Sequence, residues 1–193
     1  MPVCANASRR PNRLRRAVTL GALSTAMVPL RAQMTADSAA EDGPTNPAEH
    51  SRTPLPKVGD MLRLPEVPML DGSTFRPASA SGRLLVLYWW ASTCPFCAEQ
   101  SPEMEKLWRN QQARGLLLLG LSIDKEPEDA RDYLRRKGYT WPSGFVTADV
   151  NRALPKPFGL PITVVRGRSG RVLQAERGQL FPEDVEQLAR WLV

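Results

Sequence analysis

The chain has 193 residues, of which 42% are hydrophobic and 24% charged, a balance that excludes a fibrous or wholly disordered protein. This length accommodates one sizeable domain and a tail. The formal net charge is +6, but six arginines and no acidic residue lie in the first 32 positions, so the rest of the chain is neutral overall. The charge therefore indicates no nucleic-acid partner.

Residues 1–32 are predicted to be an export signal, because an arginine-rich segment precedes the apolar stretch Ala17–Leu30 and the small residue Ala32 follows it. The stretch has 14 residues, whereas a membrane-spanning helix needs about 20, which favours cleavage over anchoring. The paired arginines permit twin-arginine export, with Sec export as the alternative. Cys4 precedes the apolar stretch and would leave with the signal.

Residues 33–57 are predicted to be a flexible linker, because they are mostly small and polar and bury too little apolar surface to offset the entropy of ordering. The only histidine, His50, lies in this segment and is assigned no function. The compact domain is predicted to span residues 58–193.

From Val58 onward, apolar runs and turn signals predict alternating strands and helices. The run Leu84–Trp90 is continuously apolar, which is typical of a central strand buried on both faces, and Pro95 fits the first position of a helix. The predicted elements are a hairpin of Met61–Leu64 and Ser73–Arg76, the strands Leu84–Trp90 and Leu116–Ile123, the helices from Pro95 to about Ala113, Glu126–Lys137 and Pro182–Leu192, and a second hairpin of Ile162–Arg166 and Arg171–Ala175. The long crossover makes the two core strands parallel, so the fold class is α/β.

Cys94 and Cys97 lie at the start of the helix that Pro95 opens. The helix N-terminus presents free N–H groups and the positive end of its dipole to the Cys94 sulfur, which favours the thiolate and makes it a nucleophile. Cys97 lies one turn further on the same face and can close a disulfide. The pair predicts thiol–disulfide exchange, in which Cys94 attacks a substrate disulfide and Cys97 displaces the product, or the reverse.

Other interpretations of the pair stay open at this point. Two inert cysteines or a structural disulfide are one, although a bridge across two residues closes almost no loop and stabilises little. A zinc site needs about four ligands, and the mature chain offers only Cys94, Cys97 and His50, so no metal site is assigned. Two thiolates can hold Cu(I), so the alternative functions are a copper chaperone and a redox-inactive peptide-binding module.

The segment Trp90–Cys97, WASTCPFC, resembles the W-A-x-x-C-x-x-C signature of the TlpA/ResA-like branch of the thioredoxin superfamily. The resemblance covers roughly Val58–Val193 and includes Pro102, the strand end Ser122–Asp124 and the segment Gly159–Thr163. It implies a thioredoxin-like fold with a central mixed sheet flanked by helices and an extra N-terminal hairpin. It also implies an exported thiol-disulfide oxidoreductase whose redox-active disulfide, Cys94–Cys97, is its only cofactor.

The same resemblance implies a substrate-binding surface around the dithiol. Pro161 would be a cis-proline facing the two cysteines, and the backbone of Leu160 would pair with a bound polypeptide as an added strand. Trp90 and Phe96 would supply an aromatic rim around the dithiol. Pro95, which lies between the cysteines, is the fifth residue expected to bind substrate.

Two positions depart from the family pattern. Gln100 stands where many relatives have a glutamate, and Tyr88 stands where thioredoxin has a buried aspartate. A carboxylate there would help to deprotonate the second thiol, so attack by Cys97 is expected to be slow or assisted by water. Neither Glu99 nor Glu103 is assigned this role, because residue 99 points about 100° away around the helix and residue 103 lies a turn further along.

The sequence thus predicts an exported enzyme that acts on client proteins in a periplasm-like compartment. The resemblance favours reduction of client disulfides, with oxidation of client cysteines as the alternative. The expected partners are these clients and a membrane thiol-electron donor, with no nucleic acid, and membrane contact only if the signal segment is retained. Members of the family serve cytochrome c maturation, oxidase assembly and repair, and the loops in Tyr139–Phe158 carry no motif that selects among these clients.

Overall fold

The computed structural model describes residues 52–192. The predicted signal, residues 1–32, lies outside the described residues, as do His50 and most of the predicted linker. Within the described part of the chain, no helix is both long enough and apolar enough to cross a membrane.

The last residues of the predicted linker, 52–57, contact the domain. The backbone N–H of Phe158 donates to the Thr53 carbonyl at 2.9 Å, and Leu55 packs against the core. Residues on the N-terminal side of the predicted boundary at Val58 therefore contact the domain. A backbone hydrogen bond and an apolar contact order a segment that its polar composition alone would leave flexible.

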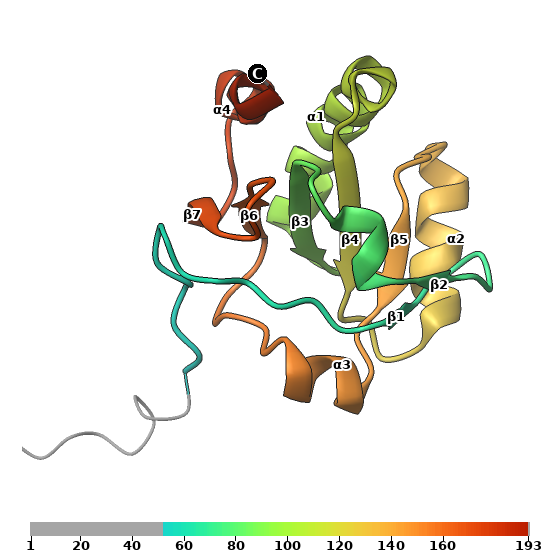
Figure 1. Cartoon of the computed structure of the whole chain (residues 1–193). Helices are drawn as coiled ribbons and strands as arrows, with labels where there is room; N and C mark the ends of the chain where they lie inside the picture. The colour runs from blue at the N-terminus through green and yellow to red at the C-terminus, as the bar shows by residue number, and fades with distance from the viewer. Residues whose placement is uncertain (1–51, 193) are drawn as a thin grey trace, which may run out of the picture. The chain divides into compact units, whose positions relative to one another are not determined.

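A five-stranded mixed sheet in the order β5-β4-β3-β6-β7 forms the centre of the domain (Figure 1). Its strands are β3 (Leu85–Trp90), β4 (Leu117–Ser122), β5 (Ser143–Phe145), β6 (Ile162–Arg166) and β7 (Val172–Arg177). β3 pairs in parallel with β4 and antiparallel with β6. The predicted α/β class, central strand, parallel crossover and C-terminal hairpin are confirmed.

Alternate residues of β3 face two hydrophobic clusters, one on each side of the sheet. Tyr88 and Trp90 pack with residues of α1, α2 and α4, whereas Leu87 and Trp89 pack with residues of α3 and η1. The helices are α1 (Pro95–Gln111), α2 (Pro127–Lys137), α3 (Ala148–Ala153) and α4 (Pro182–Gln187), with the 3-10 turns η1 (Pro77–Ala80), η2 (Gln112–Arg114) and η3 (Leu188–Leu192). All six residues of β3 are buried, as its continuous apolar run predicts.

The N-terminal hairpin is present, but its bounds differ from the prediction. It pairs β1 (Val67–Pro68) with β2 (Thr74–Phe75), whereas the sequence predicts Met61–Leu64 as the first strand. Met61 instead forms an isolated antiparallel bridge with Arg171. Met61 thus pairs with the residue that precedes β7, far along the chain, and not with a neighbouring segment. No local sequence pattern predicts such a long-range bridge.

Two elements lie in the segment 139–158, for which the sequence predicts only loops. β5 extends the sheet by pairing in parallel with β4, and α3 covers the face opposite α1. β5 has three residues and contains Gly144, so no apolar period marks it. Glycine is required there, because a Cβ at residue 144 would lie 2.4 Å from Cγ1 of Val67 in the hairpin.

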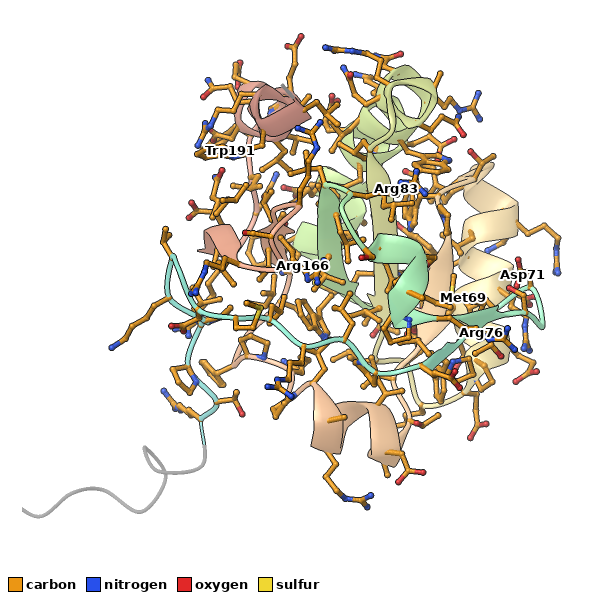
Figure 2. All side chains as sticks on the ribbon, in the orientation of Figure 1. Met69, Asp71, Arg76, Arg83, Arg166 and Trp191 are labelled. Carbon is orange, nitrogen blue, oxygen red and sulfur yellow. The ribbon has the colours of Figure 1, made fainter. Side chains whose placement is uncertain are left out.

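Arg166, at the end of β6, attaches the N-terminal segment to the sheet (Figure 2). Its Nε donates to the Leu62 carbonyl at 3.1 Å and its Nη1 to the Ala80 carbonyl at 3.2 Å. Two backbone carbonyls that lie outside the sheet thereby gain a charged donor. The chain before β3 is thus held against the domain by side-chain contacts as well as by the hairpin.

Candidate functional site

The cysteine pair lies where β3 passes into α1. β3 ends at Trp90, and Cys94 is the N-cap residue of α1, with extended backbone angles of φ −85° and ψ 115°. Its backbone N–H donates to the Ala91 carbonyl at 3.1 Å, which closes a turn between strand and helix. Pro95 then occupies the first helical position, as predicted, where its missing N–H costs no hydrogen bond.

The two sulfurs have different environments. Cys94 is partly exposed, and its Sγ accepts a hydrogen bond from the backbone N–H of Cys97 at 3.2 Å. Cys97 is fully buried. Burial raises the pKa of the Cys97 thiol strongly, and its hydrogen bond and charge interaction with Cys94 raise it further. The arrangement places an accessible sulfur at the helix end and a protonated thiol behind it.

Asp124 fixes the loop that carries Cys94. Its Oδ1 accepts from the backbone N–H of Ser92 at 2.9 Å and from the Ser92 hydroxyl at 2.8 Å. Its Oδ2 accepts from the Ser122 hydroxyl at 2.8 Å. The sequence indicates for Asp124 only a polar residue that ends a strand. The signal that could have revealed its contact is the parallel pairing of β3 with β4, which brings both strand ends to one edge of the sheet.

Gln100, which replaces the glutamate of many relatives, is fully buried in α1. Its Nε2 donates to the Thr163 hydroxyl at 3.1 Å, and its Oε1 accepts from the backbone N–H of Leu180 at 2.8 Å. The amide therefore connects α1 to β6 and to the segment before α4. It satisfies the Thr163 hydroxyl and the Leu180 N–H and, unlike the glutamate of many relatives, has no ionisable proton.

The predicted substrate-binding residues Leu160 and Pro161 directly precede β6. The peptide bond between them is cis, Pro161 is buried and Leu160 is half-buried. Because Ile162 of β6 pairs with Trp89 of β3, residues 160 and 161 lie at the end of the sheet where β3 leads into the loop that carries Cys94. The Pro161 carbonyl accepts from the backbone N–H of Gly178 at 2.9 Å, which links it to the residue after β7.

The predicted aromatic rim is only partly formed. Phe96 is 57% exposed and lies beside the cysteines, and Pro95 is exposed too. Trp90, by contrast, is fully buried and packs on Tyr133 with ring centroids 5.4 Å apart. The prediction of Trp90 as a rim residue is wrong, because Trp90 is the last residue of a strand that is covered on both faces.

The protein-family comparison matches residues 58–177 to the model of the AhpC/TSA family, more than half of the chain. The chain belongs to the AhpC/TSA family. This AhpC/TSA protein is similar to thiol-disulfide oxidoreductase ResA of Halalkalibacterium halodurans, with 22% identity over 121 residues, 61% of this chain and 67% of the relative. It is also similar to ResA of Geobacillus thermodenitrificans, with 24% identity over 121 residues, 61% of this chain and 68% of the relative.

Solved structures resemble the domain over nearly their whole length. A putative thiol:disulfide interchange protein DsbE from Chlorobium tepidum superposes with a TM-score of 0.61 at 24% identity, covering 71% of this chain and 96% of that one. A putative protein disulfide isomerase from Bacteroides thetaiotaomicron gives 0.64 at 23% identity, with coverage of 73% and 94%. The thioredoxin-like fold is confirmed, and the chain is a distant homologue of ResA- and DsbE-type oxidoreductases.

Proposed function

We propose that this protein reduces disulfides in client proteins of a periplasm-like compartment through the dithiol Cys94–Cys97. The observation that carries the proposal is the asymmetry of the pair. The Cys94 sulfur is accessible and accepts a helix N–H, while the Cys97 thiol is buried behind it with a raised pKa. Distant homology to ResA-type oxidoreductases supports the same class of reaction.

The reaction proceeds in two exchange steps that conserve atoms and electrons. The Cys94 thiolate attacks one sulfur of a client disulfide, which forms the Cys94–client bond and releases the other client sulfur as a thiolate that takes up a proton. Cys97 then loses its proton and attacks Cys94 Sγ. This second attack forms the Cys94–Cys97 disulfide and releases the client as a dithiol. The client gains two electrons, and the enzyme loses two.

A donor of two electrons must restore the dithiol after each turnover, and a membrane thiol-electron donor is the proposed source. Reduction rather than oxidation follows from the resemblance to the TlpA/ResA-like branch. The predicted signal, residues 1–32, supports export to a compartment where disulfides form and persist. Membrane contact is proposed only for a form that retains this signal, and no nucleic-acid partner is proposed.

A trapping experiment tests the order of the two steps. In Cys97→Ser the second step is blocked, so the Cys94–client mixed disulfide should accumulate and appear as a reductant-sensitive adduct by mass spectrometry. In Cys94→Ser the buried Cys97 should trap few or no clients. Equal trapping by the two variants would show that the roles of the cysteines are wrongly assigned.

Insulin-disulfide reduction and Cu(I) titration on one preparation separate exchange from copper transfer. Among residues 52–192, no three His, Cys, Asp or Glu side chains form a cluster that could hold a metal ion, but two thiolates suffice for Cu(I). Insulin reduction that Cys94→Ser abolishes is the expected result. Tight Cu(I) binding without insulin reduction would contradict the proposed function.

A further inference from the structure

A buried hydroxyl from the strand beneath the dithiol contacts the second cysteine. Tyr88, in β3, is fully buried and donates a hydrogen bond to the Cys97 carbonyl at 3.2 Å. The Ser101 hydroxyl donates to the same carbonyl at the shorter distance of 2.7 Å. The Cys97 carbonyl therefore has a second side-chain donor, and it stays hydrogen-bonded if Tyr88 turns its proton elsewhere.

The Tyr88 hydroxyl keeps its proton and can therefore donate it to an ionised Cys97 sulfur. Burial raises the pKa of Tyr88 well above its ordinary value, and the neighbouring cysteine raises it further, so the phenol stays protonated. Burial also dominates the raised pKa of Cys97, whereas the Tyr88 hydroxyl, which lies at the Cys97 backbone, acts to lower that pKa. A hydroxyl proton rotates about its C–O bond and can follow the stronger acceptor.

The other ionisable groups that face Cys97 come from three further elements. Cys94 lies at the start of α1, Tyr133 comes from α2, and Lys156 comes from the loop before β6. Burial lowers the pKa of Lys156, and its Nζ donates to two carbonyls of its own loop at 2.7 and 2.9 Å. Burial raises the pKa of Tyr133. Among these groups of the described part of the chain, Tyr88 is thus the one whose neutral hydroxyl acts to lower the pKa of Cys97.

We propose that Tyr88 is a positioning residue for the second exchange step, with a hydroxyl that turns from the Cys97 carbonyl to the Cys97 sulfur as that thiol ionises. The proton of Cys97 passes to water, Tyr88 keeps its own proton, and the stabilised Cys97 thiolate attacks Cys94 Sγ. A neutral donor thereby serves where thioredoxin has a buried carboxylate. This inference rests on the proposed function and adds to it the group that supports resolution of the mixed disulfide.

The test follows both steps with a chromogenic aromatic disulfide, which releases one coloured thiolate on attack by Cys94 and a second on attack by Cys97. Losing a hydrogen bond to a charged group should lower the Cys97 thiolate population about ten- to a hundredfold. The greater nucleophilicity of the more basic thiolate recovers about half of this on a logarithmic scale. Tyr88→Phe should therefore leave the first phase unchanged and slow the second about three- to tenfold, with its pH profile shifted to higher pH.

Two matched variants separate this role from packing and from support of the carbonyl. Tyr139→Phe removes a hydroxyl from a ring that stacks on Trp141, with the two ring centroids 4.5 Å apart, and Trp141 also contacts the Tyr88 ring. This variant should leave both phases unchanged. Ser101→Ala removes the shorter bond to the Cys97 carbonyl, together with a hydroxyl 3.5 Å from that of Tyr88, and should slow the second phase less than Tyr88→Phe. Fluorotyrosine in place of Tyr88 is a stronger donor and should accelerate the second phase.

A second phase of wild-type rate in Tyr88→Phe would overturn the inference, as would an equal loss in Ser101→Ala or slowing without a shift of the pH profile. An unchanged or slower second phase with fluorotyrosine would also overturn it. In each of these cases a normal first phase leaves the proposed function intact. If the wild-type protein shows no first phase, the proposed function fails and the inference fails with it.

Discussion

Single residues at the start of α1 determine which sulfur reacts. Cys94 precedes the first helical position and stays partly exposed, whereas Cys97 lies in the first turn and packs among the buried residues that cover β3. Two residues, Pro95 and Phe96, separate an accessible sulfur from one that solvent does not reach. The division of roles between the cysteines therefore follows from helix geometry and burial, before any other side chain contributes.

Gln100 is expected to be a structural residue, and replacing it tests this directly. Gln100→Leu replaces the amide in α1 with an apolar side chain of similar size and leaves the Thr163 hydroxyl and the Leu180 N–H without their bonds to residue 100. Each unsatisfied buried group costs about 1–3 kcal/mol, so urea denaturation should show a loss of about 2–6 kcal/mol in the free energy of unfolding. Gln112→Leu, the same change at an exposed position, should cost under about 0.5 kcal/mol. Equal losses in the two variants would contradict this role.

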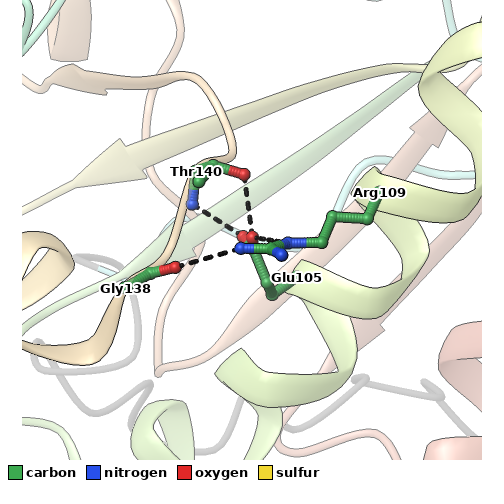
Figure 3. Close-up of polar contacts among 4 residues, drawn as sticks. All are labelled: Glu105, Arg109, Gly138 and Thr140. Atoms are coloured by element: carbon green, nitrogen blue, oxygen red, sulfur yellow. Dashed lines mark hydrogen bonds and ion pairs between the residues drawn. The ribbon is translucent and has the colours of Figure 1, made fainter.

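Whole elements are connected by a buried carboxylate on α1 (Figure 3). Glu105 accepts from the Thr140 backbone N–H at 2.7 Å and from its hydroxyl at 2.8 Å, and it forms an ion pair with Arg109. Arg109 also donates to the Gly138 carbonyl at 3.4 Å. Burial acts to raise the pKa of Glu105, but the bonds from Thr140 and Arg109 outweigh it and hold the pKa below its ordinary value. α1 is thereby attached to the segment that follows α2.

This attachment should depend on pH. A carboxyl group whose pKa is lower in the folded than in the unfolded state stabilises the fold above the unfolded pKa, about 4.3 for glutamate. That stabilisation is lost as the pH falls through the lowered folded value. Glu105→Gln should therefore reduce the free energy of unfolding at neutral pH by about 1–3 kcal/mol and show a shallower loss of stability in acid than the wild type.

Glu103→Gln is the matched control for this carboxylate. Glu103 pairs with Lys106 at 2.7 Å, but the Lys106 side chain is 67% exposed, so its loss should change stability by under about 1 kcal/mol. Denaturant titrations at several pH values measure both variants. An acid profile of Glu105→Gln that superposes on the wild type would show that Glu105 does not provide the pH-dependent stability.

At the scale of the whole molecule, the parts that sequence predicts are those with a local pattern. The continuous apolar run of β3, the proline at the start of α1 and the crossover between β3 and β4 each carry their own signal, and each is confirmed. The bridge of Met61 to Arg171 and the short strand β5 depend on pairing between distant segments. No period of apolar residues marks such pairings, so the sequence does not predict them.

The candidate site divides in the same way. The cysteines are found from sequence because a helix start and a spacing of three residues are local features. The partners that hold them are distant: Asp124 is 32 residues from Ser92, and Thr163 is 63 residues from Gln100. Only the folded sheet, which brings the ends of β3, β4 and β6 together, shows which side chains support the dithiol.

Native-state alkylation measures the unequal reactivity of the two sulfurs. The reduced protein is treated with limiting iodoacetamide at neutral pH, and peptide mapping by mass spectrometry measures the label on each cysteine over time. We expect that Cys94 is labelled first and that Cys97, which is buried, is labelled at a comparable rate only after denaturation. Labelling of both cysteines at one rate in the folded protein, or of Cys97 first, would contradict this expectation.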